Sequence, residues 1–326
     1  MDFTGILTAL FKLVALLAIG FVIYRKKYID EHFNRGLSWL VVNITNPCLI
    51  IGSLASAGDI PQQTVMKLVV YGIGYYVMLP FLAALIVRVT GIRKEDRGTA
   101  ALLAVFSNTG FMAIPIMQTL YGDMSIFVIN ILNLPFNFLV YTYGIYLIQK
   151  DIRAKQEEKL AAEGQKTASS RIKLDWKLFL TPGIVASIIA LILYFFKIQM
   201  PQPLTVTFRF IGDVTPPLTM LLLGAVLAES PIADAFTNVK LDLAMLLKLF
   251  LMPLLAFVSA RLVFDDPVII GITVLTFAMP CGTMGVMLSK NFGGNTRMAA
   301  GGIFFSTIVS LITIPLVYFI LSKVLI

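Results

Sequence analysis

Long apolar stretches follow one another along almost the whole chain, and they limit its fold more than any other feature. Each is about as long as the roughly 18 residues that an α-helix needs to cross a bilayer, or longer. Hydrophobic residues fill 58% of the 326 positions and charged residues only 13%, which is far from the balance of a soluble domain. The sequence therefore predicts an all-α integral membrane protein, not the short alternating strands of a membrane barrel.

Ten membrane spans are predicted. Their approximate limits are 6–24, 36–57, 65–89, 98–121, 124–149, 178–196, 204–228, 240–264, 267–289 and 298–322. The first stretch lacks the basic start and the small-residue cleavage site of a signal peptide, so we interpret it as a retained span. The polar segment 150–177 is interpreted as a cytoplasmic linker, because its charges are mixed and it lacks an apolar core. It separates a first set of five spans, 1–149, from a second set, 178–326.

Basic residues gather in alternate loops. They are Arg25, Lys26, Lys27 and Arg35 in the first loop, Arg88, Arg93, Lys94 and Arg97 in the third, and eight from Lys150 to Lys177 in the fifth. Loops rich in lysine and arginine face the cytoplasm, so both termini are expected outside. This orientation also accounts for the net charge of +8 without a nucleic-acid partner. Because five is an odd number, the second set of spans enters the membrane inverted relative to the first.

The two halves also match weakly in sequence. Asn43–Pro47 aligns with Asp213–Pro217 at a shift of 170 positions, and Pro80 aligns with Pro253 at a shift of 173. Asn108 then falls on Pro280 at a shift of 172. Three matches at almost one offset predict an inverted repeat, which is common in secondary transporters.

The fourth and ninth spans are each interrupted by a polar segment that contains glycine and proline. The segments are Ser107-Asn108-Thr109-Gly110 with Pro115, and Pro280-Cys281-Gly282-Thr283 with Gly285. Irregular backbone at membrane depth is tolerated only where it faces protein or a water-filled cavity. One such break is more often a simple kink, but a matched pair in an inverted repeat indicates a substrate site between broken helices.

The chemistry of these breaks favours an anion. The amino end of a half-helix carries unpaired N–H groups and about half a positive charge, so two such ends balance about one carboxylate. The candidate binding residues are Asn108, Thr109, Gly110, Pro115, Pro280, Cys281, Gly282 and Thr283. Asn43, the repeat counterpart of Asp213, is a further candidate.

Charged residues inside the predicted spans are candidates for coupling or charge balance. Asp213 binds a coupling proton or cation, or else forms a packing ion pair with Lys12 or Lys248; the sequence leaves both open. Lys12 is the candidate for balancing a second substrate carboxylate. Arg261 lies near a span end, where its side chain can reach the membrane surface.

Polar stripes mark the fifth and tenth spans. Asn130, Asn133 and Asn137 share one helical face, and Asn133 and Asn137 are candidates for substrate contact or for helix packing. Ser306, Ser310 and Thr313 form the corresponding stripe, which is expected to serve packing.

Several functional classes find no support. The phosphate-loop motif is absent, and His32 has no second histidine for a metal site or triad. Cys48 and Cys281 both lie in apolar spans and are expected to be free thiols. We therefore expect neither an enzyme, nor a metal, nor a cofactor beyond a coupling proton or sodium ion.

At this point the motifs resemble a known family. Asn43-Ile44-Thr45-Asn46-Pro47, Ser107-Asn108-Thr109-Gly110-Phe111-Met112-Ala113-Ile114-Pro115 and Met279-Pro280-Cys281-Gly282 are similar to segments of the auxin efflux carrier family, in particular its bacterial malate or malonate permeases. The resemblance implies a fold similar to bile-acid symporters and sodium/proton antiporters, with crossing fourth and ninth spans. It also implies a scaffold of spans 1, 2, 6 and 7, a mobile transport domain of spans 3–5 and 8–10, a homodimer and a bacterial inner membrane. Unlike the plant carriers, this chain has a short central loop.

The expected function is therefore secondary transport of small carboxylates, such as malate or malonate, by elevator-like alternating access. An auxin-like aromatic monocarboxylate remains an alternative substrate. A passive anion channel and a ligand sensor on the same scaffold are alternative functions.

Overall fold

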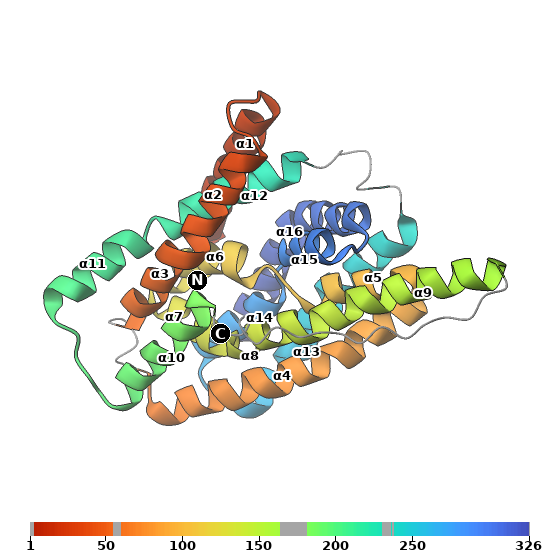
Figure 1. Cartoon of the computed structure of the whole chain (residues 1–326). Helices are drawn as coiled ribbons and strands as arrows, with labels where there is room; N and C mark the ends of the chain where they lie inside the picture. Colours follow the sequence, from red (N-terminus) through yellow and green to blue (C-terminus); the bar gives the residue numbers. More distant parts are fainter. Residues whose placement is uncertain (1–2, 55–59, 164–180, 230–235, 237, 326) are drawn as a thin grey trace.

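The computed structural model describes residues 3–54, 60–163, 181–229, 236 and 238–325, and this part of the chain is helical almost throughout (Figure 1). In the first half the helices are α1 (Phe3–Arg25), α2 (Glu31–Leu40), α3 (Asn46–Ser53), α4 (Gln62–Val89), α5 (Arg97–Val105), α6 (Ile114–Tyr121), α7 (Met124–Leu132), α8 (Leu134–Leu139) and α9 (Ile145–Glu163). In the second half they are α10 (Pro182–Phe195), α11 (Gln202–Gly212), α12 (Thr215–Glu229), α13 (Val239–Val263), α14 (Pro267–Phe277), α15 (Met284–Phe292) and α16 (Thr296–Val324). The fold is thus that of an all-α protein.

Five of the described helical segments are long and apolar enough to cross a membrane, or six if one bent pair counts as a single span. The five are Glu31–Ser53, Gln62–Val89, Gln202–Glu229, Val239–Val263 and Thr296–Val324. Predicted spans that are interrupted, such as α5 with α6 and α14 with α15, do not form one continuous helix of that length. The molecule is a multi-pass membrane protein, and its arrangement as ten spans in an inverted repeat stays a prediction.

Short π-helical turns join or precede several of the α-helices. They lie at Val41–Thr45, Thr109–Ala113 and Val140–Gly144. Such turns insert an extra residue into the helical hydrogen-bond ladder and are frequent at functional sites. The second of them belongs to the break predicted in the fourth span.

Helices α1 and α12 pack side by side at very close range, supported by a glycine on each. A β-carbon built on Gly224 would lie 2.0 Å from the carbonyl oxygen of Leu17, and one on Gly20 would lie 2.1 Å from that of Leu221. Only glycine allows two backbones to approach this closely. Helix α3 packs in turn against α10 and α11. These six helices, α1 to α3 and α10 to α12, form one side of the molecule (Figure 1).

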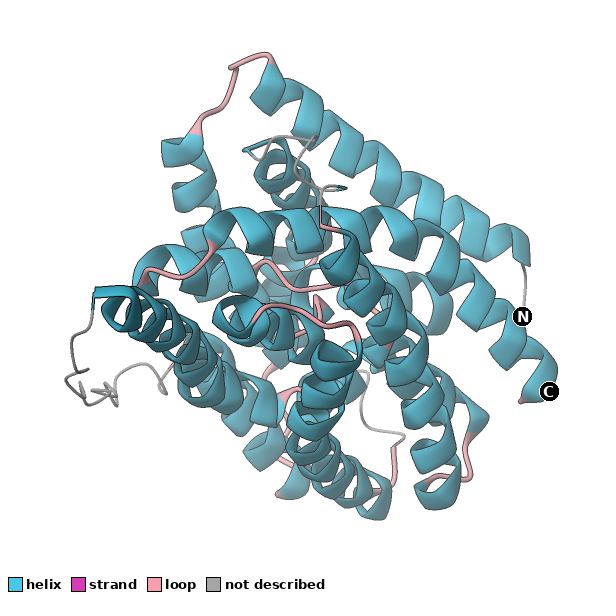
Figure 2. Ribbon diagram, turned by 90° about the vertical axis from the view of Figure 1, so that its right-hand side faces the viewer, coloured by secondary structure: helices cyan, strands magenta, loops and turns pink. Residues whose placement is uncertain are grey.

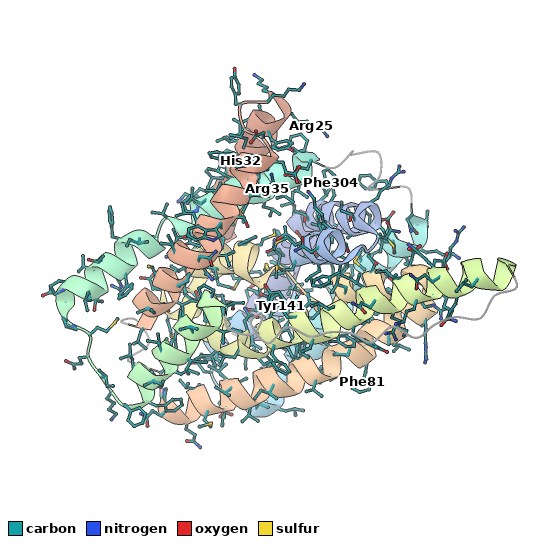
Figure 3. All side chains as sticks on the ribbon, viewed as in Figure 1. Arg25, His32, Arg35, Phe81, Tyr141 and Phe304 are labelled. Atoms are coloured by element: carbon teal, nitrogen blue, oxygen red, sulfur yellow. The ribbon has the colours of Figure 1, made fainter. Side chains whose placement is uncertain are left out.

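A second group of helices, α4 to α9 and α13 to α16, surrounds the main buried core. Ala83, Leu102, Leu103, Ala244 and Leu275 are fully buried within it. Large apolar side chains on the outer surface of this group are exposed, and Phe81 points away from α4 (Figure 3). An apolar exterior around an apolar interior is the pattern of helices in lipid.

The first basic loop and the two ends of the described chain can be located in the fold, whereas their sides of the membrane stay a prediction. Arg25, His32 and Arg35 gather around the turn between α1 and α2 at one extremity of the molecule (Figure 3). The start of α1 and the end of α16 lie close together (Figure 2). An even number of membrane crossings would leave both termini on one side.

Candidate functional site

The two breaks cross each other and are joined through their backbones. Helix α5 ends at Val105 and α14 ends at Phe277, and the chain after each runs without helical structure. Ser107 and Cys281 form an antiparallel bridge. The Asn108 N–H donates to the Pro280 carbonyl at 2.8 Å, and the Gly282 N–H donates to the Phe106 carbonyl at 2.8 Å. Backbone groups freed by the helix ends therefore satisfy each other inside the protein, as the interior of a membrane requires.

A helical amino end follows each crossing strand. On one side the π-helical turn Thr109–Ala113 leads into α6, and on the other Thr283 precedes the start of α15. Amino ends of helices present unpaired N–H groups and a partial positive charge. Each crossing strand is therefore followed by a helical amino end, and the binding of an anion at these ends stays a prediction.

Asn108 is the polar side chain at the first of these amino ends. Its Oδ1 accepts a hydrogen bond from the Phe111 N–H at 3.2 Å, so the side chain caps the turn. Its Nδ2 has no hydrogen-bond partner, although Asn108 is only 4% exposed. Buried amide donors are rarely left unpaired, and such an exception needs an explanation. A bound acceptor, such as a carboxylate oxygen, supplies one.

The two glycines of the breaks have different surroundings. A β-carbon built on Gly110 would meet no atom within 4 Å, and this residue is exposed. A β-carbon on Gly282 would lie 3.1 Å from the carbonyl oxygens of Phe106 and Ser107. Open space therefore lies beside the backbone of Gly110, whereas Gly282 permits the close contact of the two crossing strands.

The other predicted residues of the breaks are buried and have structural contacts. Pro115 is the second residue of α6, directly after the π-helical turn Thr109–Ala113. Thr109 and Thr283 are 2% and 8% exposed. The Cys281 N–H donates to Ser306 Oγ at 3.1 Å, which connects α16 to the crossing. Cys281 and Cys48 are both free thiols.

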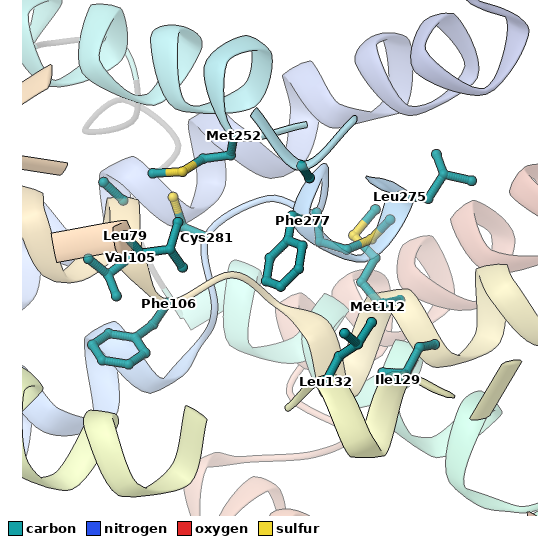
Figure 4. Close-up of a cluster of buried hydrophobic side chains, with 14 of the residues drawn as sticks. Leu79, Val105, Phe106, Met112, Ile129, Leu132, Met252, Leu275, Phe277 and Cys281 are labelled. Carbon is teal, nitrogen blue, oxygen red and sulfur yellow. The ribbon is translucent and has the colours of Figure 1, made fainter. Parts of the chain in front are cut away.

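The surroundings of the crossing are apolar. Phe106, Phe277 and Met112 are buried next to it, together with Cys281 (Figure 4). A dry environment strengthens the interaction of a charge with nearby dipoles. The partial charges of the helix ends are therefore not screened by water from this side.

The asparagine stripe of the fifth span is only partly placed at the crossing. Asn133 Oδ1 accepts a hydrogen bond of 2.9 Å from the hydroxyl of Tyr76, which is fully buried on α4. Asn130 Nδ2 donates to the Ile126 carbonyl of its own helix at 2.8 Å. The side chain of Asn137 lies outside the described part of the structure. Asn133 therefore links α4 to the end of α7.

The remaining candidates lie outside the two breaks, on α1, on the π-helical turn Val41–Thr45 and at the end of α11. Lys12 is exposed on α1, and Asp213 is exposed at the end of α11. Among the described residues, neither Lys12 nor Lys248 lies within 4.0 Å of Asp213, so the alternative of a packing ion pair is not formed. Asn43 Nδ2 donates to the Trp39 carbonyl at 2.8 Å, one helical turn away.

Sequence reasoning missed Arg209 and Thr219, and it considered Lys248 only as a packing partner of Asp213. Arg209 lies inside the predicted seventh span, and its Nη2 is 3.9 Å from Asp123 Oδ2. Thr219 Oγ1 on α12 donates to the Pro216 carbonyl at 2.8 Å and is 3.3 Å from that of Phe111. Lys248 is fully buried on α13, and its Nζ donates to the Met279 carbonyl at 2.8 Å. A charge inside an apolar span was the signal for both Arg209 and Lys248.

A multi-pass helical protein whose broken helices meet around an unpaired buried donor belongs structurally with membrane transporters. A family model described as a membrane transport protein matches residues 5–318. The chain therefore belongs to this family, which is that of the auxin efflux carriers, and is a transporter rather than an enzyme.

Two relatives place the chain among transporters of very different organisms. It is 21% identical to auxin efflux carrier component 8 of Arabidopsis thaliana, with 99% of each chain covered. It is 23% identical to an uncharacterised transporter of Methanocaldococcus jannaschii, with 69% of this chain and 68% of the relative covered. The similarity to the plant carrier spans both halves and both breaks.

Proposed function

We propose that this protein is a secondary transporter of small organic anions, and that it binds a substrate carboxylate beside Asn108 and Gly110. The unpaired Asn108 Nδ2 is the observation that carries the proposal. Asn108 caps the helical turn that contains Gly110, which has open space beside it, and the backbone bridge joins this break to the second one. The amide N–H₂ and the helix dipoles all favour the same ligand, an oxygen with negative charge.

The capacity of the site bears on the substrate. Two helix ends balance about one negative charge, which suits a monocarboxylate or one end of a dicarboxylate. Malate and malonate are the proposed substrates, and Lys12 is the candidate for their second carboxylate. The plant relative is named an auxin carrier, so an aromatic monocarboxylate is the second substrate class to test.

The proposed mechanism is elevator-like alternating access. Helices α1 to α3 and α10 to α12 serve as the scaffold, and α4 to α9 with α13 to α16 move as the transport domain. The close α1–α12 packing supports a rigid scaffold, and the bonded crossing supports a transport domain that moves as one body. A homodimer in the bacterial inner membrane, with both termini outside, completes the proposal.

Asp213 is the proposed coupling residue for a proton or a sodium ion. It is exposed and forms no ion pair among the described residues. The test is uptake measured against pH and sodium: Asp213→Asn should abolish the dependence on the coupling ion. If uptake by the variant still depends on pH or sodium, another residue binds the coupling ion.

The binding site is tested with purified protein in proteoliposomes, using labelled malate, malonate and indole-3-acetate. Loss of a hydrogen bond to a charged group costs about 1.5–3 kcal/mol, so Asn108→Ala should weaken apparent affinity by roughly 10- to 150-fold. Asn291→Ala, an exposed position on α15, is the matched control. Unchanged affinity in Asn108→Ala would show that the substrate carboxylate does not bind at Asn108.

The same vesicles separate a carrier from the alternatives. A carrier shows saturable uptake that is accelerated when unlabelled substrate is present on the opposite side. A passive channel shows flux without this acceleration. A sensor binds the ligand, which raises its thermal stability, but shows no flux.

A further inference from the structure

Lys248 is 0% exposed, the deepest burial of any charged side chain in the described part of the molecule, and nothing in the proposed site yet uses it. Its Nζ donates to the carbonyl of Met279 at 2.8 Å. Among the described residues, no carboxylate lies within 4.0 Å of it. An unpaired charge inside a membrane protein is costly, so such a residue is a candidate for function.

The position of Lys248 connects it directly to the crossing. Met279 precedes Pro280, whose carbonyl accepts the Asn108 N–H at 2.8 Å. The path from Nζ to the Asn108 nitrogen therefore consists of two hydrogen bonds and one residue of backbone. With ordinary bond lengths this path cannot exceed about 12 Å.

The predicted inverted repeat indicates that the fold does not require a charge at this position. At the shift of 173 that relates Pro80 on α4 to Pro253 on α13, Lys248 corresponds to Tyr75. Tyr75 is also buried and also donates one hydrogen bond, to the Met252 carbonyl at 2.6 Å. A neutral side chain thus performs the equivalent packing in the first half, and only the second half carries a cation.

We propose that Lys248 is the fixed cation of the anion site and that the bound carboxylate is its missing counter-charge. This inference rests on the proposed function and deepens it. Together with the two helix ends, Lys248 brings the positive charge around the crossing to about two elementary charges. The site then holds a monocarboxylate tightly and has charge enough for a dicarboxylate. Lys248 acts without touching the substrate, as a positioning residue behind Met279.

Two variants separate the charge of Lys248 from its hydrogen bond. Lys248→Gln keeps a donor for the Met279 carbonyl but removes the charge, and Lys248→Arg keeps the charge. Taking this length of about 12 Å as the separation between Nζ and the carboxylate, and an effective dielectric constant near 20, losing the charge weakens anion binding by roughly tenfold. We expect Lys248→Gln to raise the KM for malonate and for indole-3-acetate by about this factor. The KM of Lys248→Arg for both substrates should stay within about threefold of the parent's KM.

The matched control is Lys67, on α4. Its Nζ also donates to a backbone carbonyl at a helix end, that of Val263, at 3.2 Å. Lys67→Gln should leave the KM of every carboxylate unchanged. Thermal unfolding without ligand adds a second readout: Lys248→Met should be at least as stable as the parent, because removing an unpaired buried charge relieves its cost. Its stabilisation by malonate should be much reduced.

The outcomes distinguish this inference from the proposed function. If the parent protein neither transports nor is stabilised by any carboxylate, the proposed function fails and this inference fails with it. If the parent responds and Lys248→Gln has the parent's KM, only the role of Lys248 is overturned. An equal rise in KM in Lys248→Arg and Lys248→Gln would also overturn it, because the shape of the side chain rather than its charge would then determine anion binding.

Discussion

At the scale of single residues, Gly110 and Gly282 show that the same amino acid serves opposite purposes in the two breaks. Gly110 leaves space beside a helical amino end, and Gly282 removes the space between two strands. The sequence pairs Gly282 with Gly110 as repeat counterparts, and only the structure separates their roles. Substitution distinguishes a position that faces a ligand from one that faces protein.

Gly110→Leu is expected to retain the stability of the parent and to lose most of its transport. The new side chain meets no protein atom close to its β-carbon, but it fills the space proposed for the carboxylate. Thermal unfolding in detergent and uptake in proteoliposomes measure the two effects separately. Full uptake by this variant would show that the substrate binds elsewhere.

Gly282→Ala is expected to behave in the reverse manner. Its β-carbon would press on the Phe106 and Ser107 carbonyls at 3.1 Å, so the crossing strands must separate slightly. Overpacking of this kind costs about 1–3 kcal/mol, and the unfolding temperature should fall. An unfolding temperature equal to the parent's would indicate that the crossing is less tightly packed than described.

The residues at the site differ in how far the sequence could predict them. Asn108 and Cys281 lie in polar breaks that a local pattern reveals, and the structure places both on the crossing strands. The contact of Lys248 with Met279 joins residues 31 positions apart, and that of Tyr76 with Asn133 joins residues 57 apart. Such contacts depend on how helices pack, so hydropathy reveals the unusual residue but not its partner.

At the scale of helices, α9 supports the crossing from outside it. Asp151 on α9 is 2% exposed and accepts hydrogen bonds from the backbone N–H groups of Gly98 and Thr99, both at 2.6 Å. It also accepts one from Thr99 Oγ1 at 2.8 Å. A carboxylate at the amino end of α5 thus caps the helix that leads into the first break. The predicted linker therefore begins with a residue that fixes α5.

Asp151→Ala should lower the free energy of unfolding by about 2 kcal/mol, because a buried cap is lost and backbone donors are left unpaired. Glu158→Ala, an exposed position on the same helix, is the control. Thermal unfolding midpoints of both variants measure the effect. If the unfolding midpoint of Asp151→Ala equals that of Glu158→Ala, water replaces the hydrogen bonds of the cap without a loss of stability.

The packing of α1 against α12 should likewise be sensitive to substitution of a glycine at their contact. Gly224→Ala places a methyl group 2.0 Å from the Leu17 carbonyl, so one helix must move. We expect a lower unfolding temperature, whereas Gly74→Ala, with no neighbour within 4 Å, should have little effect. Equal stability of the two variants would mean that α1 and α12 can separate without cost.

At the scale of the whole molecule, two ion pairs connect the proposed scaffold with the proposed transport domain. Glu31 at the start of α2 pairs with Lys290 near the end of α15, and Asp123 before α7 pairs with Arg209 on α11. By the predicted orientation, the first lies on the cytoplasmic side and the second on the outer side. Exposed pairs add little stability, so either can break when the domains move.

A disulfide between the first pair should stop this movement. In a background without Cys48 and Cys281, oxidation of Glu31→Cys with Lys290→Cys is expected to abolish transport, and reduction should restore it. Lys94→Cys with Glu157→Cys joins two positions of the proposed transport domain, whose charged atoms lie 3.6 Å apart, and should leave transport intact. Undiminished transport by the first cross-linked protein would exclude an elevator movement along this boundary.

The backbone bridge between Ser107 and Cys281 also sets how the substrate can be reached. Two hydrogen bonds between the breaks hold the two strands together, so a substrate cannot pass between the strands without breaking both. The two crossing strands therefore do not move apart to admit the substrate. Under the proposed mechanism, access changes when the intact crossing is covered on one side of the membrane and uncovered on the other.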